Sequence, residues 1–280
     1  MFRNQMMIDR TIRRALEEDL GSGDLTTDAV VGPDREGKAS LLAREQIVLA
    51  GLPVFRRVFE ILSEAMTFEF YFEEGQVIRG EEEVGRMSGP VDVILKGERT
   101  ALNFLQRTSG IATLTRRYVD RIKPRKVRLV DTRKTAPGLR VFDKYAVRIG
   151  GGFNHRFGLY DGILIKDNHI VAAGSVTKAV FLAKQGCPHT IKVEVEVEDL
   201  DALEEAIQAG ADVVLLDNMS AQMLKKAVQL SKGRVQLEAS GGITLENIEE
   251  IAETGVDIIS VGALTHSVRA VDISLEMTPQ

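Results

Sequence analysis

The sequence predicts an α/β protein with two parts, an N-terminal α+β domain and a C-terminal array of alternating strands and helices that closes into a barrel. Residues 1–95 combine helical patterns with runs that alternate between apolar and polar, as half-buried antiparallel strands do. After residue 127 short apolar runs recur, and the last four lie roughly twenty residues apart, the length of one strand–helix unit. Gly210, Gly233 and Gly255 stand where the helices of these units should end.

The N-terminal part has two segments with helical spacing, in which apolar side chains recur every three or four positions. The run MTFEFYF alternates between apolar and polar, as a strand with one buried face does. The expected order is a helix over 8–20, a loop over 21–27, a strand or hairpin over 38–49, a helix over 52–62, a strand over 66–72 and short strands near 77–78 and 84–87.

Residues 97–123 form the predicted connector, as one helix or as two helices broken near Ser109. We place the first domain at residues 1–105 and the barrel at residues 106–265. The tail, residues 266–280, alternates like a strand. We expect it to pack back on the first domain.

The second part shows six clear apolar runs and leaves room for a seventh strand. A doubly wound sheet is the alternative to a barrel, but its usual GxGxxG signal is absent after the first strand. The apolar runs end at Val130, Ile165, Val197, Leu216, Ala239 and Val261, and helical patterns lie between them at 137–149, 200–207, 223–230 and 248–252.

The composition, 44% hydrophobic and 28% charged, is that of an ordinary globular protein with a sizeable core. No apolar run approaches the ~18 residues of a membrane span, and the charged N-terminus lacks the apolar core of a signal peptide. We therefore expect a cytoplasmic protein without a membrane segment. The single cysteine, Cys187, excludes an intrachain disulfide and a cysteine metal cluster, and we expect it at a helix end.

The net charge of −5 is unevenly distributed along the chain. Residues 99–169 hold 16 Lys and Arg against 5 Asp and Glu, a local charge of +11, so the remainder carries −16. A positive segment in an acidic protein indicates an anionic ligand. The cations of residues 116–128 face several ways and are expected to solvate a helix. Nucleic acid is disfavoured because the overall charge is negative and aromatic residues are scarce.

Groups that can bind a ligand, either polar side chains or the backbone of glycines, follow every predicted strand of the second part. In a barrel the active site lies at the carboxyl ends of the strands, so these groups should converge on one site. For each of them alone, a solvated loop end or an internal salt bridge is the simpler interpretation. The groups are Asp131, Arg133 and Lys134, then Lys166, then Glu196, then Asp217, then Ser240, Gly241 and Gly242, and finally Gly262.

The same groups indicate the kind of ligand. Two glycine-containing turns, SGGIT (240–244) and VGALTHS (261–267), follow the last strands, where backbone N–H groups and helix N-termini favour a phosphate. Arg133, His155 and Arg156 could receive a planar carboxylate, which arginine binds bidentately. A structural hydrogen bond within the glycine-rich loop is an equally good interpretation of His155.

Glu196 and Asp217 are the carboxylates at neighbouring strand ends. They could hold Mg²⁺ together with phosphates or ribose hydroxyls, or serve as counter-ions to Lys166 and Lys134. Glu194 shares the parity of Glu196 in VEVEV, so both should point into the barrel. His169 is expected to cap the loop after Lys166. The residues alone thus predict an enzyme that acts on a phosphorylated, polyanionic substrate together with a carboxylate.

The chain resembles quinolinate phosphoribosyltransferase (nicotinate-nucleotide pyrophosphorylase, carboxylating) from GSGDLTT near its start to the C-terminal tail, which is nearly its whole length, and six stretches carry the resemblance. They are DTRKTAPGLR, KYAVRIGGGFNHRFGLYDGILIKDNHI, EVEV, LLDN, SGGIT and VGALTHS. The resemblance implies an N-terminal α/β sandwich domain, an open seven-stranded α/β barrel and a homodimer. It also implies the reaction of quinolinate with phosphoribosyl pyrophosphate, which needs Mg²⁺ and yields nicotinate mononucleotide, pyrophosphate and CO₂.

The resemblance also implies roles for single residues. Arg133, His155 and Arg156 would bind quinolinate, with Lys166 beside them. Arg99 would be lent to the site by the partner subunit. The remaining implied substrate contacts are Lys134 and Lys166 facing pyrophosphate and ribose, Glu196 and Asp217 near ribose and Mg²⁺, Thr132 in the DTRKT motif, and Ser240, Gly241, Gly242, Val261, Gly262 and Ala263 around the 5-phosphate. Lys134, Lys166, Glu196 and Asp217 would be the catalytic residues.

Three other functions fit the sequence less well. The acceptor could be another carboxylate such as nicotinate. The cluster of Arg99, Arg133, His155 and Arg156 instead favours an acceptor with two carboxylates. Lys166 at a strand end could form a Schiff base in a lyase. A protein that only binds an anion or nucleic acid would leave the polar strand ends without a purpose.

Overall fold

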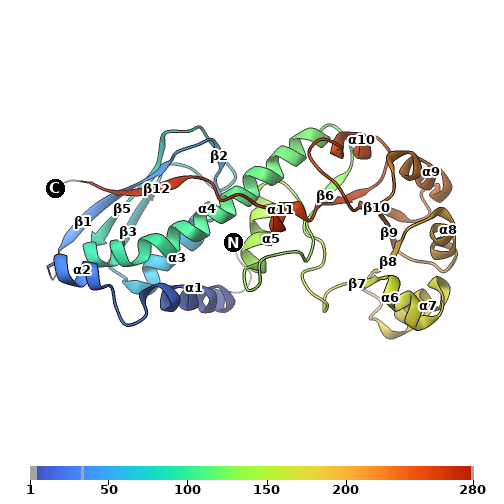
Figure 1. Cartoon of the computed structure of the whole chain (residues 1–280), viewed down its shortest axis with the longest axis horizontal. Coiled ribbons are helices and arrows are strands. Elements are labelled where there is room, and N and C mark those ends of the chain that lie inside the picture. Colours follow the sequence, from blue (N-terminus) through green and yellow to red (C-terminus); the bar gives the residue numbers. More distant parts are fainter. Residues whose placement is uncertain (1–4, 33–34, 279–280) are drawn as a thin grey trace. The chain divides into compact units, whose positions relative to one another are not determined.

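The computed structural model describes residues 5–32 and 35–278, which fold as two compact units (Figure 1). The first unit comprises Met1–Arg116, Ala136–Gly151 and Ser267–Gln280, and the second comprises Arg117–Thr135 and Gly152–His266. The domain boundary expected at residues 105 and 106 therefore falls inside a continuous helix. The chain is an α/β protein, with antiparallel strands in the first unit and parallel strands in the second.

The first unit is built on an antiparallel sheet with the order β12-β1-β5-β3 (Figure 1). Strand β12 comes from the C-terminal tail and pairs along β1, with Leu275 opposite Leu41. Strands β2 and β4 form a separate pair. The bounds are β1 (Glu36–Ala43), β2 (Ile47–Val48), β3 (Thr67–Phe70), β4 (Val77–Ile78), β5 (Glu82–Pro90) and β12 (Ile273–Met277). The helices are α1 (Gln5–Leu20), α2 (Leu25–Val30), α3 (Leu52–Leu62), α4 (Val91–Ile122) and α5 (Arg140–Ile149).

Apolar side chains at helical spacing fill the core of this unit. Helix α1 buries Ile8, Ile12 and Leu16, which lie four residues apart on one face. Helix α3 buries Phe55 and Phe59, whose rings meet edge to face with centroids 5.2 Å apart. Each such side chain contributes about 1.5–3 kcal/mol by leaving water. The helices predicted over 8–20 and 52–62 are confirmed.

The loop predicted over residues 21–27 is wrong in its second half, because Leu25 begins α2. Asp24 caps this helix and accepts hydrogen bonds from the backbone N–H groups of Thr26 and Thr27, each at 3.0 Å. An aspartate in this position satisfies N–H groups that the first turn leaves unpaired. GSGDLTT therefore contains the start of a helix, although its two glycines are typical of a loop.

Of the two alternatives for the connector, one helix is confirmed and two helices broken near Ser109 are not formed, since α4 runs without interruption through Gly110. A side chain at Gly110 would place its Cβ 2.3 Å from the carbonyl oxygen of Arg269. The Ser109 hydroxyl donates a hydrogen bond of 3.0 Å to the carbonyl of Ala50. The small residues at this point serve close packing against two other segments of the unit.

The second unit contains a parallel sheet in the order β6-β11-β10-β9-β8-β7 (Figure 1). From β7 to β11 each strand lies beside the next, and β6, the first, lies beside β11, the last. A doubly wound sheet instead reverses direction from a central strand, so this order is not that of the alternative. The bounds are β6 (Arg128–Val130), β7 (Ile163–Ile165), β8 (Val193–Val197), β9 (Val213–Asp217), β10 (Gln236–Ser240) and β11 (Ile258–Ser260).

Six strands of this sheet lie among the described residues, where the resemblance implied seven. One further parallel bridge joins Phe153 to Val130 on β6. Helices follow the strands, and Cys187 caps the end of α7 as predicted. Their bounds are α6 (Asp167–Ala173), α7 (Val176–Gly186), α8 (Leu200–Gln208), α9 (Ala221–Ser231), α10 (Ile248–Ala252) and α11 (Ala263–His266).

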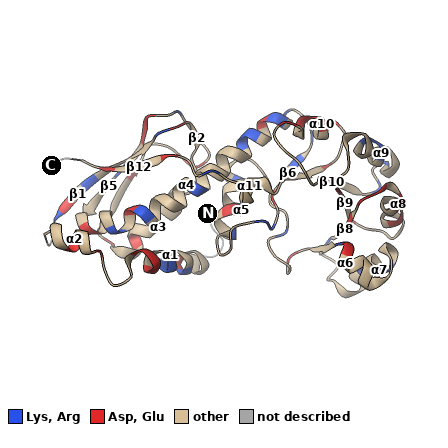
Figure 2. Cartoon of the chain, viewed as in Figure 1, with Lys and Arg blue, Asp and Glu red and all other residues tan. Residues whose placement is uncertain are grey.

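Among the described residues, none of the helices has the length and apolar character that a membrane crossing requires. The basic segment 117–128 belongs to the second unit and is paired with acids of that unit, and Figure 2 shows red on the ribbon of α10 near this segment. Arg125 lies 3.6 Å from Glu249 and also contacts Glu253, and Lys123 lies 2.9 Å from Asp120. These cations are thus partly neutralised by their own neighbours.

Candidate active site

A cavity of about 400 Å³ lies at the carboxyl ends of the parallel strands in the second unit. In parallel α/β sheets this edge is where ligands bind. Nine of the predicted site residues line the cavity, with Leu164, Leu215, Glu238 and Ser260. The nine are Thr132, Arg133, Lys134, His155, Arg156, Lys166, Glu196, Asp217 and Ser240.

The other predicted residues lie nearby in the chain but do not line this cavity. Gly241 has a φ of +88°, and a Cβ there would come within 2.2 Å of the side-chain oxygen of Asn218. A Cβ at Gly262 would lie 3.1 Å from the Cδ atom of Lys134. Gly242, Val261 and Ala263 adjoin these glycines in the same two turns. Arg99 is an exposed residue of α4 in the first unit.

Lys166 and Glu196 form an ion pair across the cavity wall. Lys166 follows β7, Glu196 is on β8, and Lys166 Nζ contacts Glu196 Oε2. The backbone N–H of Lys166 donates to Nδ1 of His169 at 2.9 Å, which confirms that His169 caps this turn. The counter-ion interpretation of Glu196 is therefore confirmed, and its second carboxylate oxygen can still serve a ligand.

Asp217 ends β9 and accepts a hydrogen bond of 2.8 Å from the Nδ2 group of Asn218. No ion pair joins Asp217 to Lys134 in residues 5–32 and 35–278, so that predicted counter-ion pair is not formed. Lys134 is held by its backbone: its N–H donates to Thr132 Oγ1 at 3.0 Å, and its carbonyl accepts from Thr265 Oγ1 at 2.8 Å. Its ammonium group thus extends from a fixed backbone.

Arg133 and Arg156 bring two guanidinium groups to one wall of the cavity. Burial and the charge of Arg133 lower the pKa of Arg156 below its usual value. Nη1 of Arg156 donates to the carbonyl of Gly162 at 3.0 Å, which leaves other N–H groups of the guanidinium for a ligand. Two neighbouring positive charges favour an anion between them, and arginine can bind a carboxylate with two parallel hydrogen bonds.

Asp131 fixes the loop that carries these groups. It is fully buried, accepts the backbone N–H of His155 at 2.9 Å and accepts Nδ2 of Asn154 at 2.6 Å. The backbone of Phe153 pairs with β6 on either side, through Leu129 and Asp131. The glycine-rich loop is therefore tied to the end of β6 over three consecutive residues.

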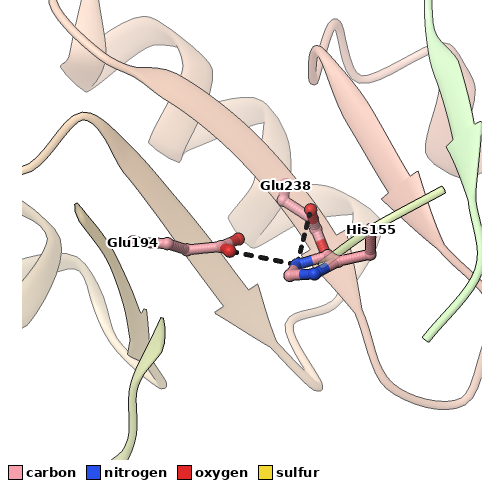
Figure 3. Close-up of side chains that lie close together, drawn as sticks. All are labelled: His155, Glu194 and Glu238. Atoms are coloured by element: carbon pink, nitrogen blue, oxygen red, sulfur yellow. Dashed lines mark ion pairs between the residues drawn. The ribbon is translucent and has the colours of Figure 1, made fainter. Parts of the chain in front are cut away.

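His155 points away from this loop toward two buried glutamates, as Figure 3 shows. Its Nε2 atom lies 3.0 Å from Oε2 of Glu194 on β8 and 3.7 Å from Oε2 of Glu238 on β10. Burial raises the pKa of Glu238, and the negative charge of Glu194 raises it further, while His155 opposes the rise. The structural interpretation of His155 is thereby supported.

Glu238 was not predicted from the sequence, although a signal was present. In QLEAS, Glu238 stands two residues before Ser240, so both side chains face the same side of the strand. Glu194 has the same relation to Glu196 on β8 and is buried as predicted. On both β8 and β10, a polar residue near the carboxyl end of the strand is therefore preceded, two positions earlier, by a buried glutamate.

Two groups of side chains offer ligands to a cation. Glu196 and Asp217 provide carboxylate oxygens at adjacent strand ends beside the phosphate-type turns, which is the donor set that Mg²⁺ prefers. His155, Glu194 and Glu238 bring one nitrogen and two oxygens within 4.8 Å of one another. Both groups contribute to the lining of the cavity, and the two acids of the second group are buried.

Comparison with known proteins gives consistent results along the whole chain. The family described as "Quinolinate phosphoribosyl transferase, N-terminal domain" matches residues 24–109, and its C-terminal domain matches residues 111–276. A relative from Bacillus subtilis (strain 168), named "Probable nicotinate-nucleotide pyrophosphorylase [carboxylating]", is 42% identical over 275 residues, covering 98% of this chain and 95% of the relative.

A plant relative and a solved structure extend this likeness. "Quinolinate phosphoribosyltransferase [decarboxylating] 2b, mitochondrial" from Nicotiana tabacum is 41% identical over 289 residues, covering 96% of this chain and 82% of the relative. The crystal structure of NadC from Streptococcus pyogenes is 45% identical, covers 98% of both chains and superposes with a TM-score of 0.95.

Proposed function

The chain belongs to the quinolinate phosphoribosyltransferase family, and we propose that it transfers the phosphoribosyl group of phosphoribosyl pyrophosphate to quinolinate. Decarboxylation follows, and the products are nicotinate mononucleotide, pyrophosphate and CO₂. One observation carries this proposal: Arg133, Arg156, Lys134 and Lys166 converge with two carboxylates on one cavity. Both substrates are polyanions, and the cavity combines cations for them with acids for a cationic ribose.

Quinolinate would bind against Arg133 and Arg156. Each of its two carboxylates can take a bidentate arginine, and their negative charge would relieve the repulsion that lowers the pKa of Arg156. His155 and Thr132 line the same cavity and complete the acceptor side. A single-carboxylate acceptor such as nicotinate would leave part of this positive charge unpaired.

Phosphoribosyl pyrophosphate would occupy the other side of the cavity. Its 5-phosphate would bind at the turns of Ser240 to Gly242 and Val261 to Ala263, where backbone N–H groups are available to an anion. Lys134 and Lys166 would face the pyrophosphate. Their charges stabilise the leaving group as the bond to the anomeric carbon breaks.

Glu196 and Asp217 would serve the ribose and a Mg²⁺ ion, to which they offer carboxylate oxygens. When bound, Mg²⁺ would neutralise charge on the pyrophosphate. The two carboxylates also stabilise the positive charge that develops on the ribose ring as the leaving group departs.

The bond changes need little acid–base chemistry from the protein. The pyridine nitrogen attacks the anomeric carbon, and the bond to pyrophosphate breaks with its electron pair on oxygen. The carboxylate on the ring carbon next to the nitrogen then leaves as CO₂. The electron pair stays on that carbon, stabilised by the quaternary nitrogen, and takes a proton from water.

The active species is proposed to be a homodimer in which Arg99 of each subunit reaches the partner's cavity. Complementation tests this directly. Arg99→Ala and Lys134→Ala would each be inactive alone, yet a mixed dimer has one site with both residues intact. Random mixing should restore about a quarter of the wild-type activity, because half of the dimers are mixed and each has one complete site. No recovery after verified subunit exchange would contradict a shared site.

The proposal also includes one expectation about the fold and one about the cellular location. The bridge of Phe153 to β6 would be the seventh strand of an open barrel, beside β6 and next to the opening toward β7. The cytoplasmic location stays a prediction from the sequence.

The test of the proposed reaction is a coupled assay with quinolinate, phosphoribosyl pyrophosphate and Mg²⁺ that follows CO₂ and nicotinate mononucleotide. Nicotinate is the control acceptor. Product from quinolinate alone is expected, whereas product from nicotinate alone would move the acceptor assignment. With no product from either, borohydride trapping of Lys166 would test the Schiff-base lyase. The ion pair with Glu196 suits an ammonium group, whereas a Schiff base needs a neutral amine.

A further inference from the structure

The polarity of the hydrogen bonds around His155 fixes where its proton lies. The backbone N–H of Arg156 donates to Nδ1 of His155 at 2.7 Å. A ring nitrogen that accepts a hydrogen bond carries no proton, so a neutral imidazole here has its proton on Nε2. That proton points to Oε2 of Glu194 at 3.0 Å, with Oε2 of Glu238 as the second acceptor at 3.7 Å (Figure 3).

This arrangement fits a shared proton better than a metal ion. The donor set of one imidazole and two carboxylates would suit a divalent cation. A metal on Nε2 would force the ring proton onto Nδ1, where it would oppose the N–H of Arg156. The existing hydrogen bond therefore favours Nε2–H as the group that faces the two acids.

Arg156 is held at two points, one of which passes through His155. Its backbone N–H bonds to the imidazole, and its Nη1 bonds to the carbonyl of Gly162 at 3.0 Å. His155 is itself held by its backbone, which donates to Asp131 at 2.9 Å. The acids on β8 and β10 lie on the Nε2 side of the ring and restrain it there. Glu194 and Glu238 are 7% and 2% exposed, and each has one carboxylate oxygen with no hydrogen-bond partner within residues 5–32 and 35–278.

We propose that Glu194 and Glu238 are positioning residues that lock the His155 ring and, through its Nδ1 atom, the backbone of Arg156, so that the Arg156 guanidinium is aimed at a carboxylate of the acceptor. In this role Glu194 and Glu238 act through His155 and need no contact with the substrates. The inference rests on the proposed function for the identity of the acceptor, and on the hydrogen bonds above for everything else.

Steady-state kinetics of Glu194→Gln and Glu238→Gln test this role. Both substitutions keep the size of the side chain but remove the charge that attracts Nε2–H. The KM for quinolinate should rise about tenfold, the typical worth of one charge-assisted hydrogen bond. The KM for phosphoribosyl pyrophosphate should stay within about twofold, because its proposed contacts lie elsewhere. Glu204→Gln on α8, which removes a carboxylate paired with Arg234, is the matched control and should change neither constant.

A double-mutant cycle separates positioning from a merely structural role. If Glu194 acts through His155, adding Glu194→Gln to His155→Ala should change the KM for quinolinate no further. The same tenfold rise in both backgrounds would overturn the proposal. A fall in kcat and in the melting temperature together with a rise in both KM values would overturn it as well.

The tautomer of His155 supplies a readout that needs no turnover. Long-range ¹H–¹⁵N spectra of the wild-type chain should show the proton on Nε2, and the signal is assigned by its loss in His155→Asn. A proton on Nδ1 would overturn the proposal even in an active enzyme. Absence of turnover with quinolinate and an intact Nε2–H signal would instead reject the proposed function and leave the acid–histidine cluster standing.

Discussion

Replacing Arg156 by lysine separates the charge of the acceptor site from its geometry. In the structure one nitrogen of the guanidinium, Nη1, donates to the carbonyl of Gly162, and Arg156 lines the same cavity as Arg133. Lysine keeps the positive charge but can neither bond Gly162 and a carboxylate at once nor bind the carboxylate with two parallel hydrogen bonds.

The loss of one charged hydrogen bond corresponds to about 1.5–3 kcal/mol, which is roughly 10- to 100-fold in affinity. We therefore expect Arg156→Lys to raise the KM for quinolinate by such a factor and to leave the KM for phosphoribosyl pyrophosphate nearly unchanged. Initial rates at varied concentrations of each substrate measure both. Arg117→Lys, on the exposed face of α4, is the control. An unchanged KM for quinolinate, or an equal rise in both constants, would refute the assignment of Arg156 to the acceptor.

Further predictions concern catalysis, packing and pH. Lys134→Ala should abolish turnover while circular dichroism and the melting temperature stay near wild type; full activity would remove Lys134 from the mechanism. Gly110→Ala forces a Cβ to within 2.3 Å of the Arg269 carbonyl and should cost about 1–3 kcal/mol in urea unfolding, whereas an unchanged midpoint would show that the segments shift freely. Asp131→Asn should raise the KM for quinolinate and lower the melting temperature, because one carboxylate oxygen that accepts an N–H becomes an amide donor. Burial and the charge of Glu194 raise the pKa of Glu238 to about 7, above the ordinary value of 4.5, so the stability it contributes is complete below about pH 4.5 and is lost as pH rises through about 7. Glu238→Gln should flatten the decline of unfolding free energy between about pH 4.5 and pH 7, and a decline as steep as in wild type would contradict the raised pKa.

Periodicity was a good guide wherever one chemical pattern dominated. The two N-terminal helices and all six apolar runs of the second part correspond to helices or strands. Gly210, Gly233 and Gly255 follow α8, α9 and α10 with positive φ angles, as the helix ends require. These features depend on local sequence, and local sequence was sufficient to predict them.

The failures arose where distant segments decide the local structure. Gly110 and Ser109 look like a helix break until Arg269 and Ala50 are seen packed against them. Asp24 was masked by two glycines, although an aspartate before an apolar turn is a helix-start signal. Strand order, and with it the choice against a doubly wound sheet, depends on hydrogen bonds between strands that no single stretch contains.

The candidate site was predicted as a set of strand ends, and nine of its members do line one cavity. The sequence did not reveal that Glu194 and Glu238 come together as a second group of acids. Spacing placed Glu194 inside but gave no reason to pair it with Glu238, because the two lie on different strands, β8 and β10, and come together only in the fold, where the imidazole lies close to both. A loop residue from 39 positions before Glu194 makes that link.

The buried acids Glu194 and Glu238 also affect how much a bound ligand stabilises the folded chain. Arg156 is destabilised by burial and by Arg133, and the charge of Glu194 offsets part of that cost. The offset is incomplete, since the net effect still lowers the pKa of the guanidinium. An anion bound between the two arginines supplies the missing compensation, so this relief adds to the affinity of a ligand with carboxylates, and the affinity sets how far the ligand stabilises the folded chain. Quinolinate should therefore raise the melting temperature more than nicotinate at equal free concentration, and Glu194→Gln should shrink that difference, because the Arg156 guanidinium is then less firmly positioned and the affinity for quinolinate falls. An unchanged or larger difference in Glu194→Gln would mean that the acid has no part in positioning Arg156 for the ligand.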